Sequence, residues 1–94
     1  MTAYQEVGRG NQTALNITSA TLVKVGAGRI AKVSVTTAGA IGNVYDSATT
    51  AGVSAANLLA AIPATVQVFE LDMPFTSGLV IAPGVAQVVT VSFS

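Results

Sequence analysis

The feature that most constrains the fold is a succession of short segments rich in valine, isoleucine and threonine, broken every few residues by glycine, proline, asparagine or serine. Branched side chains of this kind favour extended backbone over helix. The segments expected to form strands are residues 13–18, 21–25, 29–37, 41–46, 65–71, 78–82 and 85–93. Short strands at such regular spacing, with turn signals between them, indicate a sandwich or barrel.

One stretch, residues 54–62 (SAANLLAAI), is compatible with a helix, with Leu58, Leu59 and Ile62 as its apolar face. It has about two turns, too few for stability without packing, and Pro63 ends it. A one-turn helix and an irregular strand are equally plausible structures for this segment. We therefore expect an all-β, antiparallel β-sandwich, jelly-roll-like, with about seven or eight short strands and at most one short helix.

Domain organisation follows from the same pattern. Residues 1–12 (MTAYQEVGRGNQ) are polar, contain two glycines and show no periodicity, so we expect an N-terminal arm. Such a segment cannot offset its own ordering entropy, and we expect it to fold on assembly. Residues 13–94 form a single β-sandwich domain, because a chain of 94 residues has no room for a second core.

The tripeptide 26–28 (GAG) separates the segments 21–25 and 29–37, and the pattern predicts a hairpin turn. The same glycines fit the dinucleotide-binding pattern G-x-G-x-x-A, with Asp46 near the place of a ribose-binding acid. That pattern needs a helix after the second glycine, whereas residues 32–37 are rich in β-branched residues. We therefore predict a turn and no cofactor site.

The last segment, 85–93, contains no charged residue on either face of the expected strand. One face carries Val85, Gln87, Val89, Val91 and Phe93, and the other carries Ala86, Val88, Thr90 and Ser92. A strand that is solvated on one face normally alternates apolar with strongly polar residues. This segment is therefore expected to be buried on both faces or to lie at an interface.

Charge is scarce throughout, at 9% of residues against about 25% in ordinary soluble domains. A chain of this length folding alone hides only about 63% of its unfolded surface. It has no cysteine and no histidine, so disulfides and the usual zinc ligands cannot supplement the core. We therefore expect a symmetric homo-oligomer, with a trimer as the first choice.

The charged residues suggest few catalytic or metal-binding groups. Glu70 and Asp72 alternate along one strand and could share a cation or act as an acid/base pair, but calcium needs six or more oxygen ligands. Without histidine, the serine and threonine hydroxyls lack their usual activating base, and Lys24 or Lys32 has no supporting context for that role. We predict no enzyme activity and no catalytic, cofactor-binding or metal-binding residues.

Lys24, Arg29 and Lys32 are the one local basic cluster, and no aromatic residue separates them, so we expect no nucleic-acid binding. The uncharged runs 47–69 and 73–94 are long enough to cross a bilayer, but polar residues and prolines interrupt them. We expect no membrane span, and the first ten residues show no secretory signal. The lack of cysteine fits assembly in a reducing cytoplasm.

The aromatic residues have two expected roles. Phe69, Phe75 and Phe93 are predicted to anchor the core or an interface. Tyr4 lies in the polar arm, where we expect it either to dock on a neighbouring subunit or to be unordered.

Two stretches resemble small structural proteins of tailed bacteriophages. Residues 22–52 (LVKVGAGRIAKVSVTTAGAIGNVYDSATTAG) resemble a strand ending in a GAGR turn, a VSV-TAG strand and a short strand ending in YD. Residues 65–84 (TVQVFELDMPFTSGLVIAPG) are similar to a strand followed by a PF-SGL-V strand. Together they cover about half the chain, whereas residues 54–61 do not match. The shared motifs describe turns and strands, so the resemblance carries over no functional residues.

The resemblance implies a β-sandwich subunit of the virion: a head decoration (cement) protein, a head-fibre base or a tail component. Its partners would be copies of itself and the major capsid protein or other virion proteins. We expect a decoration protein on the capsid exterior, assembled in the host cytoplasm, that stabilises the head through subunit interfaces. A tail or neck component and a carbohydrate- or receptor-binding sandwich are the alternatives, and the last would favour exposed aromatics around a groove.

Overall fold

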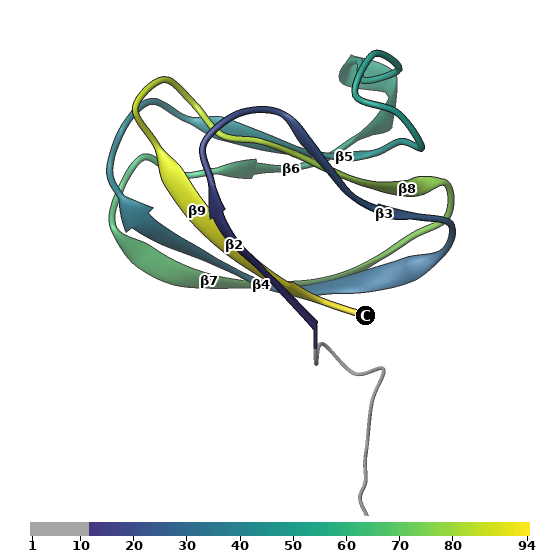
Figure 1. Cartoon of the computed structure of the whole chain (residues 1–94), viewed down its shortest axis with the longest axis horizontal. Helices are drawn as coiled ribbons and strands as arrows, with labels where there is room; N and C mark the ends of the chain where they lie inside the picture. Colours follow the sequence, from purple (N-terminus) through teal and green to yellow (C-terminus); the bar gives the residue numbers. More distant parts are fainter. Residues whose placement is uncertain (1–11) are drawn as a thin grey trace, which may run out of the picture.

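The computed structural model describes residues 12–94, and residues 1–11 lie outside the described part. The described chain contains eight strands and one short 3-10 segment (Figure 1). In chain order these are β2 Gln12–Ile17, β3 Thr21–Val25, β4 Gly28–Thr37, β5 Gly42–Asp46, η1 Ala55–Asn57, β6 Leu58–Ile62, β7 Gln67–Phe75, β8 Gly78–Ala82 and β9 Val88–Phe93. The all-β prediction is confirmed. The predicted arm, residues 1–12, lies outside the description except for Gln12, which begins β2.

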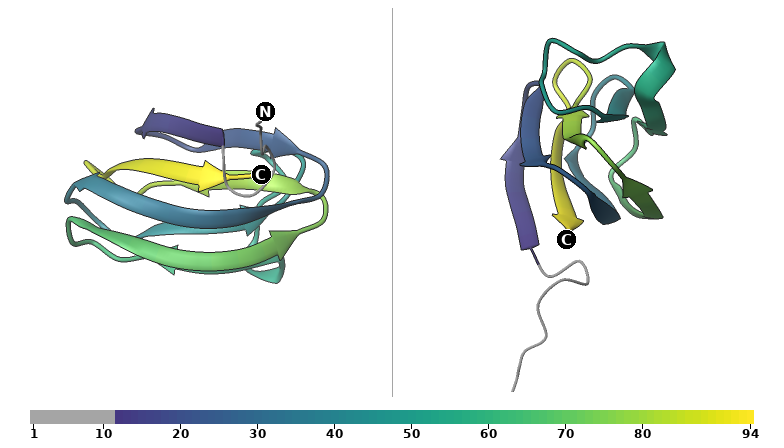
Figure 2. Two further views of the ribbon diagram at one scale, coloured as in Figure 1. Left: turned by 90° about the horizontal axis from the view of Figure 1, so that it is seen from below. Right: turned by 90° about the vertical axis from the view of Figure 1, so that its right-hand side faces the viewer.

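The strands form two four-stranded sheets, with the orders β2-β9-β4-β7 and β3-β8-β5-β6. Every pairing is antiparallel. The two sheets face each other as two layers (Figure 2). Consecutive strands lie in opposite sheets, except for β5 and β6, which are neighbours. This interleaved order is that of a jelly roll, which confirms the predicted antiparallel, jelly-roll-like sandwich.

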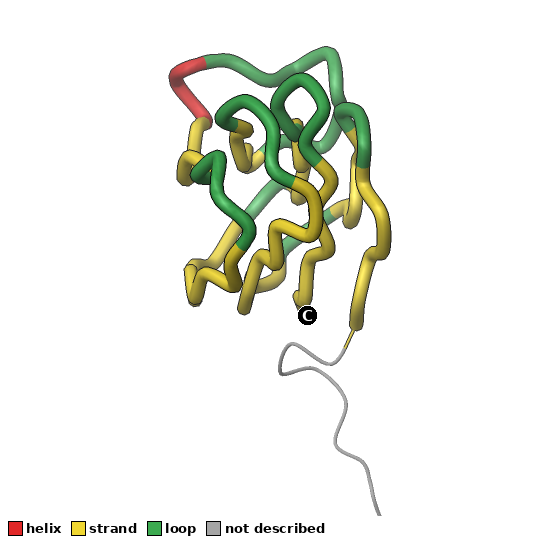
Figure 3. Tube along the Cα trace, turned by 90° about the vertical axis from the view of Figure 1, so that its left-hand side faces the viewer, coloured by secondary structure: helices red, strands yellow, loops and turns green. Residues whose placement is uncertain are grey.

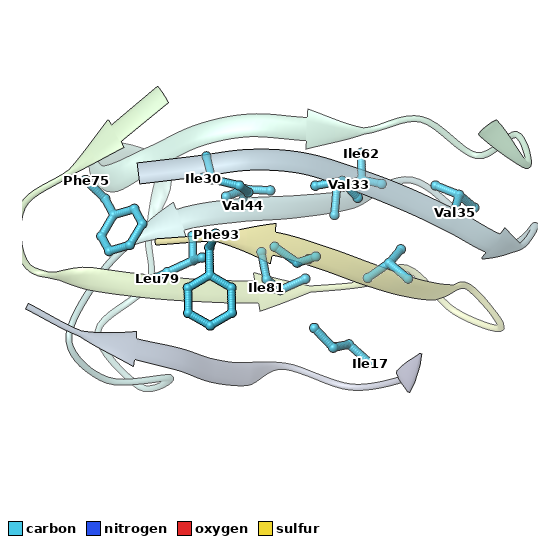
Figure 4. Packing of buried hydrophobic residues seen from close by; sticks show 12 residues of the cluster. Ile17, Ile30, Val33, Val35, Val44, Ile62, Phe75, Leu79, Ile81 and Phe93 are labelled. Atoms are coloured by element: carbon cyan, nitrogen blue, oxygen red, sulfur yellow. The ribbon is translucent and has the colours of Figure 1, made fainter. Parts of the chain in front are cut away.

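The core lies between the sheets and contains aliphatic side chains with two phenylalanines (Figure 4). Its members are Ile17, Ile30, Val33, Val35, Val44, Ile62, Phe75, Leu79, Ile81, Val89, Val91 and Phe93. Alternation along the strands places them there, because every second side chain of a strand points to the same face. Phe75 and Phe93 are core residues as predicted, whereas Phe69 is only half-buried.

The C-terminal strand has the predicted core face but begins later than expected. Val89, Val91 and Phe93 are buried, and Val88, Thr90 and Ser92 on the other face are half-buried in the single chain. Val85 is 84% exposed, because residues 84–87 form a turn in which the Gln87 N–H donates to the Gly84 carbonyl at 3.0 Å. The prediction that Val85 belongs to the core face is therefore wrong.

Gln87 is a buried polar residue that links this turn to Pro63, the residue after β6. Its side-chain oxygen accepts from the Gly84 N–H at 3.1 Å, and its side-chain nitrogen donates to the Pro63 carbonyl at 2.8 Å. Buried amides of this kind are retained when both ends are hydrogen-bonded. The position was predicted to face the core with the valines, and the structure shows why an amide is tolerated there.

The glycine turn at 26–28 does not form a hairpin, so that prediction is wrong. β3 pairs with β8 in one sheet, and β4 pairs with β7 and β9 in the other. The turn therefore crosses between the sheets. Gly26 has φ +92°, and a Cβ at Gly28 would clash with the Ser94 carbonyl oxygen and the Phe75 ring. Glycine is needed for the sharp crossing and the close approach of these chains.

The strand expected at residues 65–71 does not end at residue 71, because β7 runs on through residues 72–74 to Phe75. Asp72 has φ 46°, and the register with β4 shifts between Ile30 and Lys32, so the strand bulges there. Pro74 is tolerated because β7 is an edge strand with one unpaired side. The sequence signals marked an irregularity in the strand and not its end.

The two alternatives for residues 54–62 follow one another along the chain. η1 forms one 3-10 turn, in which the Ser54 Oγ accepts from the Ala56 N–H at 3.3 Å and the Asn57 side chain accepts from the Ser54 N–H at 2.8 Å. β6 then begins at Leu58 (Figure 3). Leu58 is 44% exposed while Ile62 is buried, so the two do not form the single apolar face that a helix would give.

The two faces of β9 predict opposite responses to a carboxylate. Val89→Asp places an unpaired charge in the core and should lower the free energy of unfolding by roughly 4 kcal/mol or more, a large part of the about 5–15 kcal/mol that such a domain has in total. Val88→Asp should cost about 1 kcal/mol or less, because its side chain lies on the outer face. Urea denaturation followed by circular dichroism measures both. Equal destabilisation by the two substitutions would contradict the one-sided core.

Candidate functional site

The carboxylates that could have formed a metal or acid/base site lie at an exposed sheet edge. Asp72 forms an ion pair with Arg29 at 3.0 Å, and the same guanidinium donates to the Asp72 carbonyl at 3.1 Å. Glu70 lies opposite Lys32 in the β4–β7 register. Among the described residues there is no group of three or more histidine, cysteine, aspartate or glutamate side chains that could hold a metal ion. Exposed pairs of this kind contribute about 0–1 kcal/mol.

The predicted basic cluster is divided between the two layers. Lys24 is on β3, whereas Arg29 and Lys32 are on β4 in the other sheet. Arg29 is also engaged with Asp72. The structure therefore does not gather the three cations on one strand or one sheet.

Asp46, considered above as a possible ribose-binding acid, holds the turn between β7 and β8. One carboxylate oxygen accepts from the Thr76 N–H at 3.0 Å and from the Thr76 hydroxyl at 3.1 Å. The other accepts from the Ser77 N–H at 2.8 Å and the Gly78 N–H at 3.3 Å. Desolvation raises the pKa of Asp46, but the three backbone donors and the hydroxyl together leave that pKa below its usual value of 3.8. The carboxylate has a structural role in this turn.

The outer face of the β2-β9-β4-β7 sheet carries mostly small side chains on its central strands. One row across the strands contains Thr13, Ser92, Lys32 and Glu70, and the next contains Thr90, Ser34 and Val68. Val88 follows on β9, where its carbonyl accepts from the Thr36 hydroxyl at 3.2 Å. This is the face that was expected to meet another subunit, and that expectation stays a prediction.

The opposite layer carries an uncharged row on its outer face that the sequence analysis did not single out. Leu22, Val80, Tyr45 and Leu58 lie side by side across all four strands of the β3-β8-β5-β6 sheet. Val80 is fully buried although it lies outside the core cluster, and its cross-strand neighbours on this face are Leu22 and Tyr45. The alternation of β8 alone could not reveal this row, since its neighbours come from three distant segments.

A third feature is an apolar groove of about 330 Å³ along one side of the sandwich. We call it the edge groove. Its lining residues come from β6 and the following turn, from β7, and from one core position of β4: Ala61, Ile62, Pro63, Val68, Phe69, Glu70, Leu71 and Val33. Phe69, predicted as a core or interface anchor, is half-buried in this wall.

The edge groove follows from the strand order. β6 and β7 are edge strands of opposite sheets and are consecutive in the chain, so both edges open on the same side of the molecule. An edge strand presents unpaired backbone N–H and C=O groups. Val66 and Val68, beside this opening, are 63% and 58% exposed. Sequence reasoning missed the groove because local patterns do not show which strands become edges.

Comparison with protein-family models, with curated proteins and with solved structures found no match for this chain. Among the described residues, no helix is long and apolar enough to cross a membrane. Tyr4, the predicted docking residue, lies outside the described part of the chain.

The hydrogen bonds of Asp46 predict a stability that depends on pH. Because its pKa is lower in the folded than in the unfolded chain, its stabilising contribution is complete above about pH 4 and is lost as the pH falls through the folded-state pKa. Asp46→Asn should cost about 1 kcal/mol at neutral pH and should reduce this acid-dependent loss. Urea denaturation between pH 2 and pH 7, with Asp72→Asn as the matched control, measures it. The same pH profile for wild type and Asp46→Asn would contradict this role.

Proposed function

We propose that this chain is a non-enzymatic structural protein of the virion of a tailed bacteriophage, a head decoration (cement) protein that acts as a homo-oligomer. The observation that carries the proposal is a surface unsuited to a free monomer. Large apolar side chains are exposed at Leu15, Val25, Ile41, Leu58, Val66, Val68 and Val85. A small domain with these exposed apolar side chains and so few charges would be poorly soluble as a free monomer, which favours burial against partners.

The few charges of the described domain add to this argument. Arg29 and Asp72 pair with each other, and the Asp46 carboxylate holds a turn. Lys24, Lys32 and Glu70 are the remaining charged residues of the described chain. Surface charge therefore contributes little to the solubility of the single chain. This supports the proposal that the protein functions within an assembly.

The jelly-roll fold is compatible with this role but does not distinguish it from other roles. Double-sheet jelly rolls occur in viral capsid proteins, lectins and cupins, so the fold gives only an analogy. The resemblance of residues 22–52 and 65–84 to phage structural proteins favours the virion among these. A sugar-binding role is less favoured, because Phe69 is the one aromatic residue of the edge groove and is half-buried.

The proposed mechanism is mechanical. Apolar burial contributes about 25 cal/mol per Å², and stable protein interfaces bury about 1,600 Å² in total. Subunits held in this way across adjacent capsomers would oppose the internal pressure of a packaged genome. The outer face of the β2-β9-β4-β7 sheet, with small side chains at Val88, Thr90 and Ser92, suits close contact with a capsid surface.

Mass spectrometry of purified virions with copy-number determination tests the location. A head decoration protein should be present in hundreds of copies per particle. A handful of copies would place the chain in the neck or tail, and its absence from purified virions would contradict the proposal.

A variant on the outer face tests the attachment surface. Val88→Asp should fold but bind heads that lack the protein about tenfold or more weakly, equivalent to ~1.4 kcal/mol, because a carboxylate would be desolvated in the contact. Ala48→Asp, in the exposed connection after β5, is the matched control and should bind like wild type. Co-sedimentation with purified heads measures both. Unchanged binding by Val88→Asp would exclude this face as the contact.

A further inference from the structure

We propose that the edge groove binds the N-terminal arm of a neighbouring copy of this chain, with Tyr4 as its anchor. The inference rests on the proposed homo-oligomer and names the contact that joins its subunits. Of the arm, residues 1–11 lie outside the described structure, and their chemistry is taken from the sequence alone.

The direction of the strands makes neighbouring copies compatible at their edges. Each sheet has four strands and every pairing is antiparallel, so the two edge strands of a sheet run in opposite directions. If a second copy is placed beside the first in the same orientation, its β2 runs antiparallel to the first copy's β7. The same holds for β3 and β6 in the other sheet. Such a head-to-tail contact is heterologous and can close into a ring.

The position of Gln12 determines where the arm of each copy starts. β2 starts at Gln12, on the edge of the sheet opposite β7. Within one subunit, β9 and β4 separate β2 from β7, a distance of about 14 Å at normal strand spacing. In the head-to-tail arrangement, Gln12 would instead lie beside the second half of the neighbour's β7, in the row of Met73, and the arm would turn back along β7 to reach the groove. Eleven residues of extended chain span up to about 36 Å, which is ample.

The described edges differ in how well they are protected against pairing. β2 contains an irregularity with Asn16 at φ 54°, and β3 has a register shift next to Lys24. The second half of β7 contains the Asp72 bulge and Pro74. Bulges, charges and prolines are the usual protections of sheet edges. The first half of β7, which lines the edge groove, pairs with β4 in an unbroken register from Gln67 to Glu70.

The chemistry of the arm suits this site. Tyr4 is its one aromatic residue, and Val7 adds a second apolar side chain. A tyrosine ring buries well in an apolar groove, while its hydroxyl needs a hydrogen-bond acceptor. The unpaired carbonyls of the two edge strands can supply that acceptor. Arg9, the one cation of the arm, is complementary in charge to Glu70 at the groove, whereas Glu6, its one carboxylate, would have to point away from Glu70.

Disulfide trapping tests the contact cleanly, because the chain contains no cysteine of its own. Tyr4→Cys and Val68→Cys are prepared as separate proteins, one carrying a mass tag, then mixed and oxidised. We expect a covalent heterodimer on a non-reducing gel. Leu15→Cys, exposed on the opposite edge strand β2, is the matched control partner for Tyr4→Cys and should crosslink several-fold less.

Each other outcome overturns the inference in a distinct way. Efficient crosslinking of Val68→Cys with itself would indicate two-fold pairing of β7 with β7. A fast-migrating, internally crosslinked monomer from the double variant Tyr4→Cys/Val68→Cys, without the heterodimer, would place the arm in its own groove. Equal crosslinking to the Leu15→Cys control, or none, would show that the arm has no preference for the groove.

Sedimentation equilibrium separates this inference from the proposed function. Tyr4→Ala should shift the oligomer toward monomer, and Tyr4→Phe should shift it less, because only the hydroxyl is lost. If Tyr4→Ala leaves the oligomer intact, the arm contact is wrong while the homo-oligomer stands. If the wild-type chain is a monomer at all concentrations, the homo-oligomer itself is wrong.

Discussion

The structure depends on the burial of one face of each sheet against the other. Aliphatic side chains from strands far apart in sequence meet in the core, as where Val33 of β4 lies between Phe69 of β7 and Val91 of β9. No disulfide supplements this contact, and within the described chain no metal cluster does. The polar interactions serve this packing, since Gln87 and the Asp46 carboxylate both hold turns that return a strand to the opposite layer.

The sequence predicts well what depends on local alternation. Val89, Val91 and Phe93 could be assigned to the core because their period of two survives in the fold. Prediction from the sequence fails where the structure of a turn depends on which sheet the flanking strands join. The glycines at 26–28 fit a hairpin and a crossing between layers equally well, and only the partners of β3 and β4 decide between them. Pro74 likewise signals a break unless its strand lies at an edge.

The candidate site was harder to predict for the same reason. The edge groove combines residues of β4, β6 and β7 whose neighbourhood follows from the jelly-roll order. No short motif marks it, and Phe69 was recognised only as an anchor of unspecified kind. The sequence analysis considered Glu70 and Asp72 as a pair. In the structure they have different partners, because the chain bulges at Asp72 and the Asp72 carboxylate forms an ion pair with Arg29.

Scarcity of charge and the strand order together limit how this domain can remain soluble. Edges are normally kept from pairing by charges, bulges or prolines, and β2, β3, β6 and the second half of β7 each carry at least one of these. The first half of β7 carries only Glu70 as a charge and keeps an unbroken register with β4. An edge left open beside a preformed apolar groove would promote uncontrolled association unless a partner covers it. A segment supplied by the chain itself covers every such groove in a closed ring, because each copy contributes one segment and one groove. Assembly would then satisfy the exposed edge without the charged residues that the sequence lacks.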